Sequence, residues 1–247
     1  MRALVTGASS GIGRDIAIYL DKLGFDVVLV SRDKEKLEKV KDELKGKTEI
    51  VPMDLSNSEN CKELYNKVKD IDILVNNAGF GTFGSFDETD LDKEIDLIDT
   101  NVKAMHILAK LYLKDMLQKD KGHILNVASI AGFMPGPLMC AYYASKAYVV
   151  RLSEGIREEL RKKKSNVKIS VLCPGPVDTN FNDVAGVRFK LPSYSSNHVA
   201  KYAIDKMLRN KFIIVPGLKI KMVRFLAKIS PNNVTSKIVY MMQERKR

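Results

Sequence analysis

Short runs of apolar, β-branched residues alternate along this chain with longer segments in which apolar residues recur at helical spacing. The short runs predict strands, and the longer segments predict helices between them. The expected strands are Ala3–Thr6, Asp26–Val30, Ile50–Met53, Ile71–Val75, His123–Ala128, Lys168–Leu172 and Phe212–Val215. The expected helices cover residues 12–24, 33–45, 57–69, 91–119, 141–164 and 196–209.

This alternation predicts an α/β fold: a single doubly wound parallel sheet of the Rossmann type, with helices on both faces. Continuous apolar runs such as Val27–Val30 are typical of strands that helices cover on both sides. No linker or repeat divides the 247 residues, so we expect one domain spanning residues 1–247. Its core would be residues 1–217, followed by a basic, amphipathic helical extension over residues 218–247.

Composition excludes several classes of protein. The three cysteines, Cys61, Cys140 and Cys173, form no metal or disulfide pattern, and the three histidines are equally scattered, so we expect no metal and a reducing compartment. No apolar stretch reaches the roughly 20 residues that a membrane span requires. The first expected strand follows Met1 directly, which leaves no room for a leader, so a cytoplasmic location is expected.

The net charge of +11 is unevenly distributed. Residues 218–247 hold eight Lys or Arg against one Glu, a balance of +7. Because the excess is local and no nucleic-acid-binding module accompanies it, we expect no nucleic acid partner. The amphipathic segment Leu218–Ile229 could lie on an anionic membrane, or it could dock over a substrate pocket or a partner subunit. We favour a docked helix that folds back across the substrate side, and leave membrane contact as the alternative.

A glycine loop, Thr6-Gly7-Ala8-Ser9-Ser10-Gly11-Ile12-Gly13, joins the first strand to the first helix. A helix N-terminus presents unpaired N–H groups and a partial positive charge, which suit a phosphate. Glycines allow the turn to tighten and a pyrophosphate to approach the backbone. The loop therefore predicts a dinucleotide site, formed by Gly7, Ser9, Ser10, Gly11, Ile12 and Gly13.

The end of the second strand indicates which dinucleotide. An acidic residue here would bind the ribose 2′-hydroxyl of NAD, but the chain has Ser31 and Arg32. The serine can donate a hydrogen bond to a 2′-phosphate and the arginine can pair with it. This arrangement favours NADP(H), and we interpret the following Asp33 as the N-cap of the next helix.

Tyr142 and Lys146 lie four residues apart near the start of a predicted helix, so they share one helical face. The pKa of an unperturbed tyrosine is about 10, and a neighbouring ammonium would lower it toward neutrality. Tyr143 is three residues from the lysine and is expected to pack. Ser129 ends the fifth strand, where its hydroxyl could donate to a substrate carbonyl oxygen.

With the glycine loop before them, these residues resemble the short-chain dehydrogenase/reductase family. Asn76-Asn77-Ala78-Gly79 after the fourth strand and the segment Pro174–Thr179 after the sixth belong to the same pattern, which extends over residues 1–215. The resemblance implies an NADP(H)-dependent enzyme that interconverts a carbonyl and a secondary alcohol, with the nicotinamide carrying the hydride. It also implies a homo-oligomer, a dimer or tetramer.

The family pattern assigns further roles. Asp54 and Leu55 would lie at the adenine, and Lys146 would also bond the nicotinamide ribose. Asn101 would anchor a water that connects Lys146 to solvent and so completes a proton relay with Ser129 and Tyr142. The remaining cofactor contacts implied by the resemblance are Asn77, Ala78 and Gly79 along the ribose and Pro174, Gly175, Val177 and Thr179 near the carboxamide.

The substrate is the open question. The expected pocket walls are apolar, which favours an apolar small-molecule carbonyl or alcohol. A substrate of the 3-oxoacyl type, with an acyl-carrier protein as partner, is one option. Two other functions remain: a catalytically silent NADP(H)-sensing protein, and a membrane-peripheral reductase of the lipid or steroid type. The expected walls include Phe80, Phe83, Phe133, Met134, Leu138, Met139, Phe181 and Phe189, with Arg188 and Lys190 in a lid.

Overall fold

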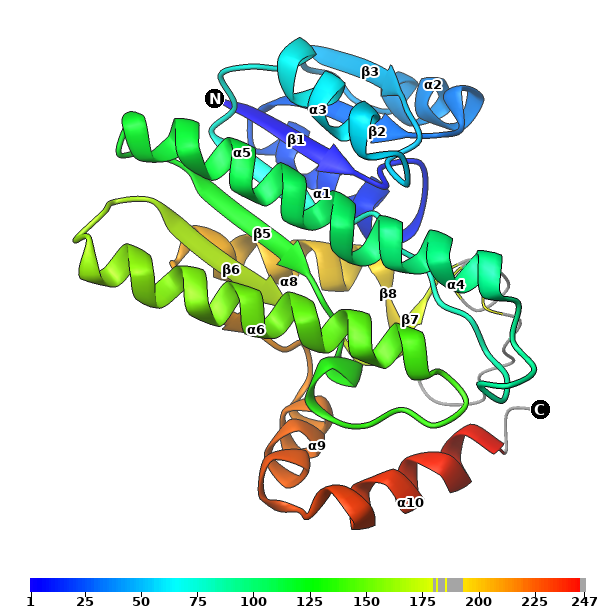
Figure 1. Ribbon diagram of the computed structural model, residues 1–247. Helices are drawn as coiled ribbons and strands as arrows, with labels where there is room; N and C mark the ends of the chain where they lie inside the picture. Colours follow the sequence, from blue (N-terminus) through cyan, green and yellow to red (C-terminus); the bar gives the residue numbers. More distant parts are fainter. Residues whose placement is uncertain (180, 182–184, 186–192, 245–247) are drawn as a thin grey trace.

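The computed structural model describes residues 1–179, 181, 185 and 193–244. Its main sheet has seven parallel strands in the order β3-β2-β1-β4-β5-β6-β9 (Figure 1). This sheet confirms the predicted doubly wound fold. The strands are β1 (Arg2–Thr6), β2 (Asp26–Ser31), β3 (Thr48–Pro52), β4 (Ile73–Asn76), β5 (His123–Val127), β6 (Lys168–Leu172) and β9 (Ile213–Ile214).

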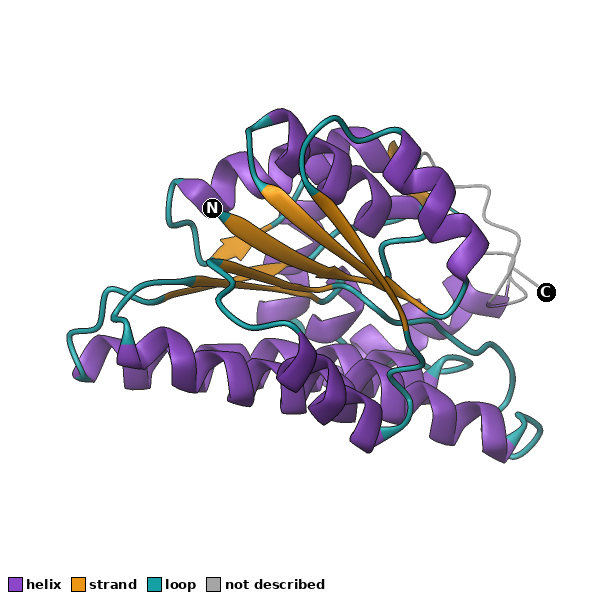
Figure 2. Ribbon diagram, turned by 90° about the horizontal axis from the view of Figure 1, so that it is seen from above, coloured by secondary structure: helices purple, strands orange, loops and turns teal. Residues whose placement is uncertain are grey.

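Helices cover both faces of the sheet, as Figure 2 shows. Successive residues of β1 face opposite sides: Leu4 packs into one buried cluster, whereas Ala3 and Val5 pack into the other. Helices α3, α5 and α6 complete the first cluster, and α1, α2 and α8 complete the second. The bounds are α1 (Gly11–Lys22), α2 (Lys34–Asp42), α3 (Ser58–Lys67), α4 (Leu91–Ile98), α5 (Met105–Gln118), α6 (Cys140–Lys162) and α8 (Ser196–Leu208).

The strand order positions the site. β1 pairs with β2 on one side and with β4 on the other, so the chain reverses its winding direction between β1 and β4. Loops that follow β1 and β4 therefore lead away to opposite faces, which leaves a crevice at the carboxyl ends of these strands. The glycine loop follows β1, directly at this crevice.

Three local features differ from the expectation. The predicted helix over residues 91–119 is interrupted by a π-helical segment, η1 (Asp99–Ala104), between α4 and α5. A 3-10 turn, η2 (Ile130–Phe133), follows β5. A small separate pair of parallel strands, β7 (Val177–Asp178) and β8 (Tyr194–Ser195), was not predicted, because two-residue strands have no periodicity to detect.

Two helices end the described chain, α9 (Leu218–Ile229) and α10 (Asn232–Glu244), and Figure 1 shows them as an arm away from the sheet. Both helices lie in the helical extension predicted over residues 218–247, within which only Leu218–Ile229 was delimited from the sequence. We call the pair the C-terminal hairpin. None of the described helices is long and apolar enough to cross a bilayer.

Helix α9 folds back over the substrate side of the cleft as predicted, since Ile220, Val223 and Leu226 border it, but the wider apolar face of the helix is not the face that docks. No residue of α9 is buried, and the side that meets the protein core carries Ile220 and Arg224. Met222, Phe225 and Ile229 instead lie outside the cleft and are between 62% and 64% exposed. The helix has apolar residues on two sides, and the wider apolar side is exposed.

Candidate active site

A cleft of about 2100 Å³ opens at the carboxyl ends of the strands. Pockets for one small ligand usually measure about 300–1,000 Å³, so this cleft has room for a dinucleotide and a second molecule. It contains most of the predicted site residues. Those that border it are Gly7, Ser9, Ser10, Gly11, Ile12, Ser31, Arg32, Asp54, Leu55, Asn77, Ala78, Gly79, Ser129, Tyr142, Lys146, Pro174, Gly175, Val177 and Thr179.

The glycine loop forms one end of the cleft. Gly7 and Gly11 have φ angles of +64° and +54°, a left-handed conformation that favours glycine. Among the described residues, the Ser10 N-cap makes no side-chain hydrogen bond to the first turn of α1. The first amides of α1 therefore remain available to an anion, and the loop fits the pyrophosphate of a dinucleotide.

Gly13 is the one predicted loop residue that does not border the cleft. It lies behind the loop, where an added Cβ would come within 2.3 Å of both the Gly7 carbonyl oxygen and the Asn77 side-chain nitrogen. Its predicted role as a cofactor contact is therefore corrected. This glycine allows α1 to pack closely against the loop.

Thr6 and Asn77 hold the glycine loop to the end of β4. The Thr6 Oγ1 accepts hydrogen bonds from the backbone amides of Asn77 and Ala78, both at 3.0 Å. The Asn77 side chain donates to the carbonyl oxygens of Thr6 at 3.0 Å and Gly7 at 3.1 Å. The side chain of Asn77, which was predicted to lie along the ribose, thus positions the glycine loop. Sequence reasoning missed Thr6, although a hydroxyl at the end of the strand before a glycine turn was a visible signal.

The end of β2 forms the part of the cleft predicted to select the cofactor. Ser31 donates to the Ser9 hydroxyl at 2.8 Å, which joins β2 to the glycine loop. Arg32 is exposed and its guanidinium lies 3.9 Å from an Asp54 carboxylate oxygen. Asp33 caps α2 by accepting from the Lys36 amide at 3.0 Å, as predicted.

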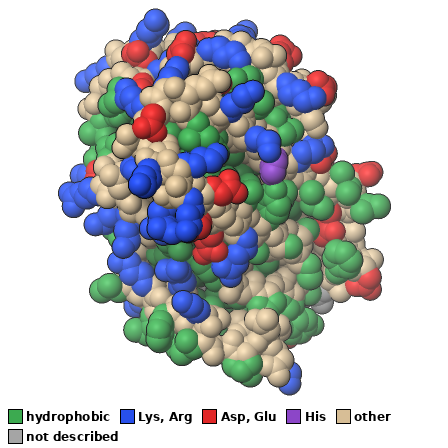
Figure 3. All heavy atoms as spheres, turned by 60° about the vertical axis from the view of Figure 1, so that its left-hand side comes forward, with side chains coloured by type: hydrophobic (Ala, Val, Ile, Leu, Met, Phe, Trp, Pro, Cys, Tyr) green, Lys and Arg blue, Asp and Glu red, His purple; other side chains and the backbone are tan. Residues whose placement is uncertain are grey.

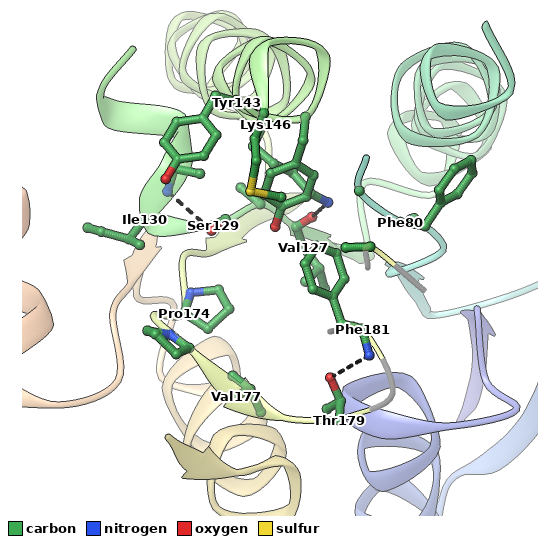
Figure 4. Close-up of a pocket in the computed structure, with 18 of the residues that line it drawn as sticks. Phe80, Val127, Ser129, Ile130, Tyr143, Lys146, Pro174, Val177, Thr179 and Phe181 are labelled. Carbon is green, nitrogen blue, oxygen red and sulfur yellow. Dashed lines mark hydrogen bonds between the residues drawn. The ribbon is translucent and has the colours of Figure 1, made fainter. Parts of the chain in front are cut away.

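Ser129, Tyr142 and Lys146 meet at the centre of the cleft. Ser129 follows β5 and caps η2, because its Oγ accepts from the Ala131 amide at 3.1 Å. Helix α6 carries the other two residues, and the Lys146 ammonium donates to the Val127 carbonyl oxygen at 3.0 Å. Figure 4 shows Ser129, Lys146 and Phe181 around one cavity. The predicted catalytic group is thereby brought together.

The electrostatics of this group differ from the prediction. Burial raises the pKa of Tyr142 to about 12, and a hydrogen bond with Ser129 offsets only part of that rise. Burial also lowers the pKa of Lys146 to about 8. The lysine does not lower the pKa of the tyrosine as expected, because its ammonium is directed at the Val127 carbonyl oxygen and lies 5.8 Å from the centre of the tyrosine ring. Tyr142 therefore keeps its proton at neutral pH and can donate it.

Asn101 lies in the π-helical segment η1, behind the cleft. Its Oδ1 accepts from the Phe80 amide at 3.0 Å, and its Nδ2 donates to the Phe80 carbonyl oxygen at 2.8 Å and to the Ser145 hydroxyl at 3.1 Å. Both the oxygen and the nitrogen of the Asn101 side chain are therefore hydrogen-bonded to protein atoms. The predicted role of Asn101 was to anchor a water. Asn101 positions the loop after β4 against α6, and π-helical turns occur frequently at functional sites.

Gly79 separates Asn101 from the lysine. An added Cβ at Gly79 would lie 2.7 Å from the Asn101 Oδ1 and 3.4 Å from the Lys146 Nζ. Only a residue without a side chain leaves this approach open. The predicted relay residues Asn101 and Lys146 thus lie on either side of Gly79.

The walls of the substrate end are largely as predicted. Phe133 does not border the cleft, because it stacks beneath Arg224 with the guanidinium 4.9 Å from its ring centre. Leu138 is buried, and its carbonyl oxygen accepts from the Gly84 amide at 2.9 Å. Predicted Phe189, Arg188 and Lys190 lie outside the described residues. The predicted residues that border the cleft here are Phe80, Phe83, Met134, Met139 and Phe181.

The C-terminal hairpin supplies a further wall, of which the sequence predicted the part from α9 but not the part from α10. Gln243 of α10 donates to the Tyr143 hydroxyl at 2.7 Å, and both residues border the cleft. Tyr143 packs against Gly136, as expected of the second tyrosine. The four-residue spacing of Thr235, Val239 and Gln243, all buried, was the signal that could have revealed α10.

Comparison with known proteins agrees with this geometry. A family model described as short chain dehydrogenase matches residues 1–186. The chain therefore belongs to the short chain dehydrogenase family of oxidoreductases. Among its relatives, an uncharacterized oxidoreductase of Staphylococcus saprophyticus is 36% identical over 214 residues, covering 83% of this chain and 91% of the relative.

Two solved structures show the same fold with a nicotinamide cofactor. A short-chain dehydrogenase from Sphingobium yanoikuyae in complex with NADPH is 30% identical, covers 88% of each chain and has a TM-score of 0.82. A short-chain dehydrogenase/reductase from Burkholderia phymatum in complex with NAD is 27% identical, covers 91% of this chain and 92% of the other, and has a TM-score of 0.84.

Proposed function

We propose that this protein is an NADP(H)-dependent oxidoreductase that interconverts an apolar ketone and a secondary alcohol. The observation that carries the proposal is the meeting of Ser129, Tyr142 and Lys146 at the centre of one cleft. The cleft has an uncapped helix N-terminus at one end and aromatic walls at the other. A nicotinamide cofactor held between these ends would supply or accept the hydride.

The residues of the chain then manage the proton and the carbonyl oxygen. Tyr142 holds its proton, since its pKa is about 12, and gives it to the developing alkoxide during reduction. The Ser129 hydroxyl donates a hydrogen bond to the same oxygen and orients it. Lys146 places a positive charge near both groups at neutral pH, because its pKa remains about 8 despite burial. Asn101 holds the loop and α6 in register around them.

The first test separates an enzyme from a protein that only senses its cofactor. Replacing Tyr142 with Phe removes one hydroxyl, so cofactor affinity should persist while reduction slows by roughly a hundredfold or more. The assay follows NADPH absorbance with a panel of apolar ketones and aldehydes. Tyr143→Phe is the matched control and should have a mild effect. Turnover by Tyr142→Phe at the wild-type rate would exclude the proposed proton donor.

The proposal includes a preference for NADP(H), supported by the Ser31-Arg32 pair and by the use of Asp33 as a helix cap. NADPH should bind at least tenfold more tightly than NADH, a difference of about 1.4 kcal/mol, and Arg32→Asp should reverse the order. Lys34→Asp makes the same charge change at an exposed residue that does not border the cleft. Fluorescence titration of both cofactors measures the ratio, and identical curves for the wild type would refute the preference.

The proposed substrate is a small apolar molecule, because Phe80, Phe83 and Phe181 border the cleft. The Phe181 ring centre lies 5.2 Å from that of Tyr142.

No nucleic acid is proposed as a partner. The free thiols of Cys61, Cys140 and Cys173 fit a reducing compartment, so a cytoplasmic location and a homo-oligomer complete the proposal.

A further inference from the structure

The exposed side of the C-terminal hairpin has an unusual composition. Along α9, apolar residues recur at positions one, five, eight, nine and twelve, a spacing that places them on one face of the helix. The residues are Leu218, Met222, Phe225, Leu226 and Ile229, and all five are exposed; Leu218 and Leu226 also border the cleft, whereas the other three do not. The opposite face, with Ile220 and Arg224, contacts the core. The exposed stripe is therefore additional to the face that docks the helix.

Helix α10 repeats the arrangement. Thr235, Val239 and Gln243 form its buried side, whereas other apolar residues of the helix are exposed outside the cleft. These residues are Val234, Tyr240 and Met241. In Figure 3 hydrophobic side chains gather at the lower end of the molecule, where Figure 1 places the hairpin. Exposed apolar surface of this extent, on two successive helices, marks an interaction surface.

Basic residues flank this surface. Lys219 lies on one side of the α9 stripe, and Lys221 and Lys228 lie on the other, as 100° of rotation per residue places them. None of the three forms an ion pair with another described residue. The complete segment 218–247 carries a balance of +7. An apolar stripe bordered by lysines is the pattern of a helix that lies in a membrane interface.

The charge also argues against the same surface on a second copy. Two hairpins meeting face to face would bring together two segments that each carry +7, and like charges oppose association. An anionic bilayer satisfies both properties of the surface, since its headgroups attract the lysines and its acyl region accepts Phe225 and Ile229.

We propose that the C-terminal hairpin seats this protein on the surface of an anionic membrane, and that the apolar carbonyl substrate enters the cleft from that membrane. The second half rests on the proposed function. Val223 and Leu226 of α9 and Ile238 and Met242 of α10 border the cleft, while their helices present apolar residues to the outside. The mouth of the cleft is thus lined by the helices that would contact the lipid.

The sequence favoured a docked helix over membrane contact, whereas this proposal combines the two. The helix does dock through one face, but that contact leaves the wider apolar face uncovered. The earlier expectation assumed one apolar face for α9, and the structure shows two.

The test uses the absence of tryptophan from the chain. Phe225→Trp, at a position that is 62% exposed, places a single reporter on the stripe. Phe86→Trp, 68% exposed and outside the hairpin, is the matched control. With vesicles of phosphatidylcholine containing one-quarter phosphatidylglycerol, the Phe225→Trp emission should shift to the blue and be quenched by brominated lipid, whereas the control should not change. No shift, or equal shifts at both positions, would overturn the proposal.

Two further variants separate the forces. Lys221→Gln with Lys228→Gln should weaken vesicle binding about 25-fold, because each lysine near an anionic surface contributes about fivefold. Lys162→Gln with Lys163→Gln at the exposed end of α6 should leave binding unchanged. A blue shift that appears without vesicles as protein concentration rises, with a matching dimer in ultracentrifugation, would assign the surface to a second copy and refute the membrane.

The last measurement keeps the two proposals apart. Tyr142→Phe should bind vesicles like the wild type, so binding is measured independently of catalysis. Phe225→Gln with Ile229→Gln, both outside the cleft, should lower kcat/KM more than tenfold for a ketone dissolved in the vesicles and leave that for a water-soluble ketone unchanged. Equal rates of the variant and the wild type on the lipid-dissolved ketone would refute entry from the membrane, even if vesicle binding holds.

Discussion

Two regions border the same cleft and are built in opposite ways. The glycine loop is fixed by close backbone contacts, with Thr6 and Asn77 hydrogen-bonded across it and Gly13 pressed against it. The C-terminal hairpin meets the rest of the protein along narrow stripes, among them the Tyr143–Gln243 hydrogen bond and the stacking of Arg224 on Phe133.

This difference explains why the conformation of the glycine loop could be predicted from the sequence more fully than the packing of the hairpin. Where backbone geometry admits only one kind of residue, as at Gly7 and Gly11, the identity of that residue reveals the conformation. Where a helix has apolar residues on two faces, as α9 does, periodicity reveals the helix but not the face that is buried. The comparison predicts large responses to substitution in the loop and small ones in the hairpin.

The largest effect is expected for Gly13→Ala. The new Cβ would come within 2.3 Å of the Gly7 carbonyl oxygen, which is backbone and cannot rotate away. We expect unfolding free energy to fall by about 3 kcal/mol, because the loop and α1 must separate. Cofactor affinity should fall with it. Urea unfolding and cofactor titration measure the two losses.

Gly155→Ala is the control for that substitution. Gly155 lies within α6, and an added Cβ there meets nothing within 4 Å. Alanine favours the helix, so the same chemical change should stabilise the protein by about 0.5–1 kcal/mol. A loss of stability at both glycines would mean that helix packing, and not the contact with Gly7, determines the result.

An intermediate effect is expected from pH, and it should be confined to the sheet. Burial lowers the pKa of His123 at the start of β5 to about 4, and its Nε2 lies 2.8 Å from the Ser170 hydroxyl. The hairpin contains no histidine. The histidine of the unfolded chain takes up its proton near pH 6.5, so between pH 6.5 and 4 the unfolded state binds more protons than the folded state. The unfolding free energy therefore decreases as the pH decreases, and at pH 5 it should be about 2 kcal/mol lower than at neutral pH.

His123→Gln should remove this part of the acid sensitivity while keeping a polar partner for Ser170. Unfolding free energies at pH 7.5 and pH 5 measure it, with exposed His198→Gln as the matched control. Should the His123→Gln protein lose as much stability on acidification as the wild type, other groups are responsible.

The smallest effect is expected in the hairpin. Gln243→Leu removes the hydrogen bond to the Tyr143 hydroxyl and should destabilise the docking of α10 by about 1 kcal/mol. That amounts to roughly fivefold faster amide exchange across residues 232–244, with little change in the Tm of the whole protein. Gln118→Leu, at the exposed end of α5, is the control. Exchange that accelerates across β1 to β6 as well would show that the hairpin is coupled to the sheet, contrary to the comparison.

Much of the fold followed from the sequence because its periodic segments are long. The seven strands and the principal helices lie where expected, within a few residues at their ends. The convergence of Ser129, Tyr142 and Lys146 also followed, because strand ends and the next helix meet at one edge of a parallel sheet.

The features that could not be predicted from the sequence depend on the direction of side chains and on their burial in the folded protein. The direction of the Lys146 ammonium, toward the Val127 carbonyl oxygen, is set by tertiary geometry, and so is the raised pKa of Tyr142. The role of Asn101 depended on which groups face it across the loop. The helical extension over residues 218–247 was predicted, but the buried face of α10 was not, because it includes Thr235 and Gln243, which an apolar pattern does not register.

The π-helical segment η1 limits how the length of this chain can vary. A π-helical turn is the result of one residue more than an α-helix would use, and each residue of an α-helix advances about 100° around its axis. Loss of one residue from Asp99–Ala104 would let the helix continue as an ordinary α-helix, and it would turn α4 by that angle relative to α5. Asn101 would then no longer face Phe80 and Ser145. A single deletion here would therefore alter the active site without replacing any residue that lines it, whereas surface loops elsewhere can absorb such changes in length.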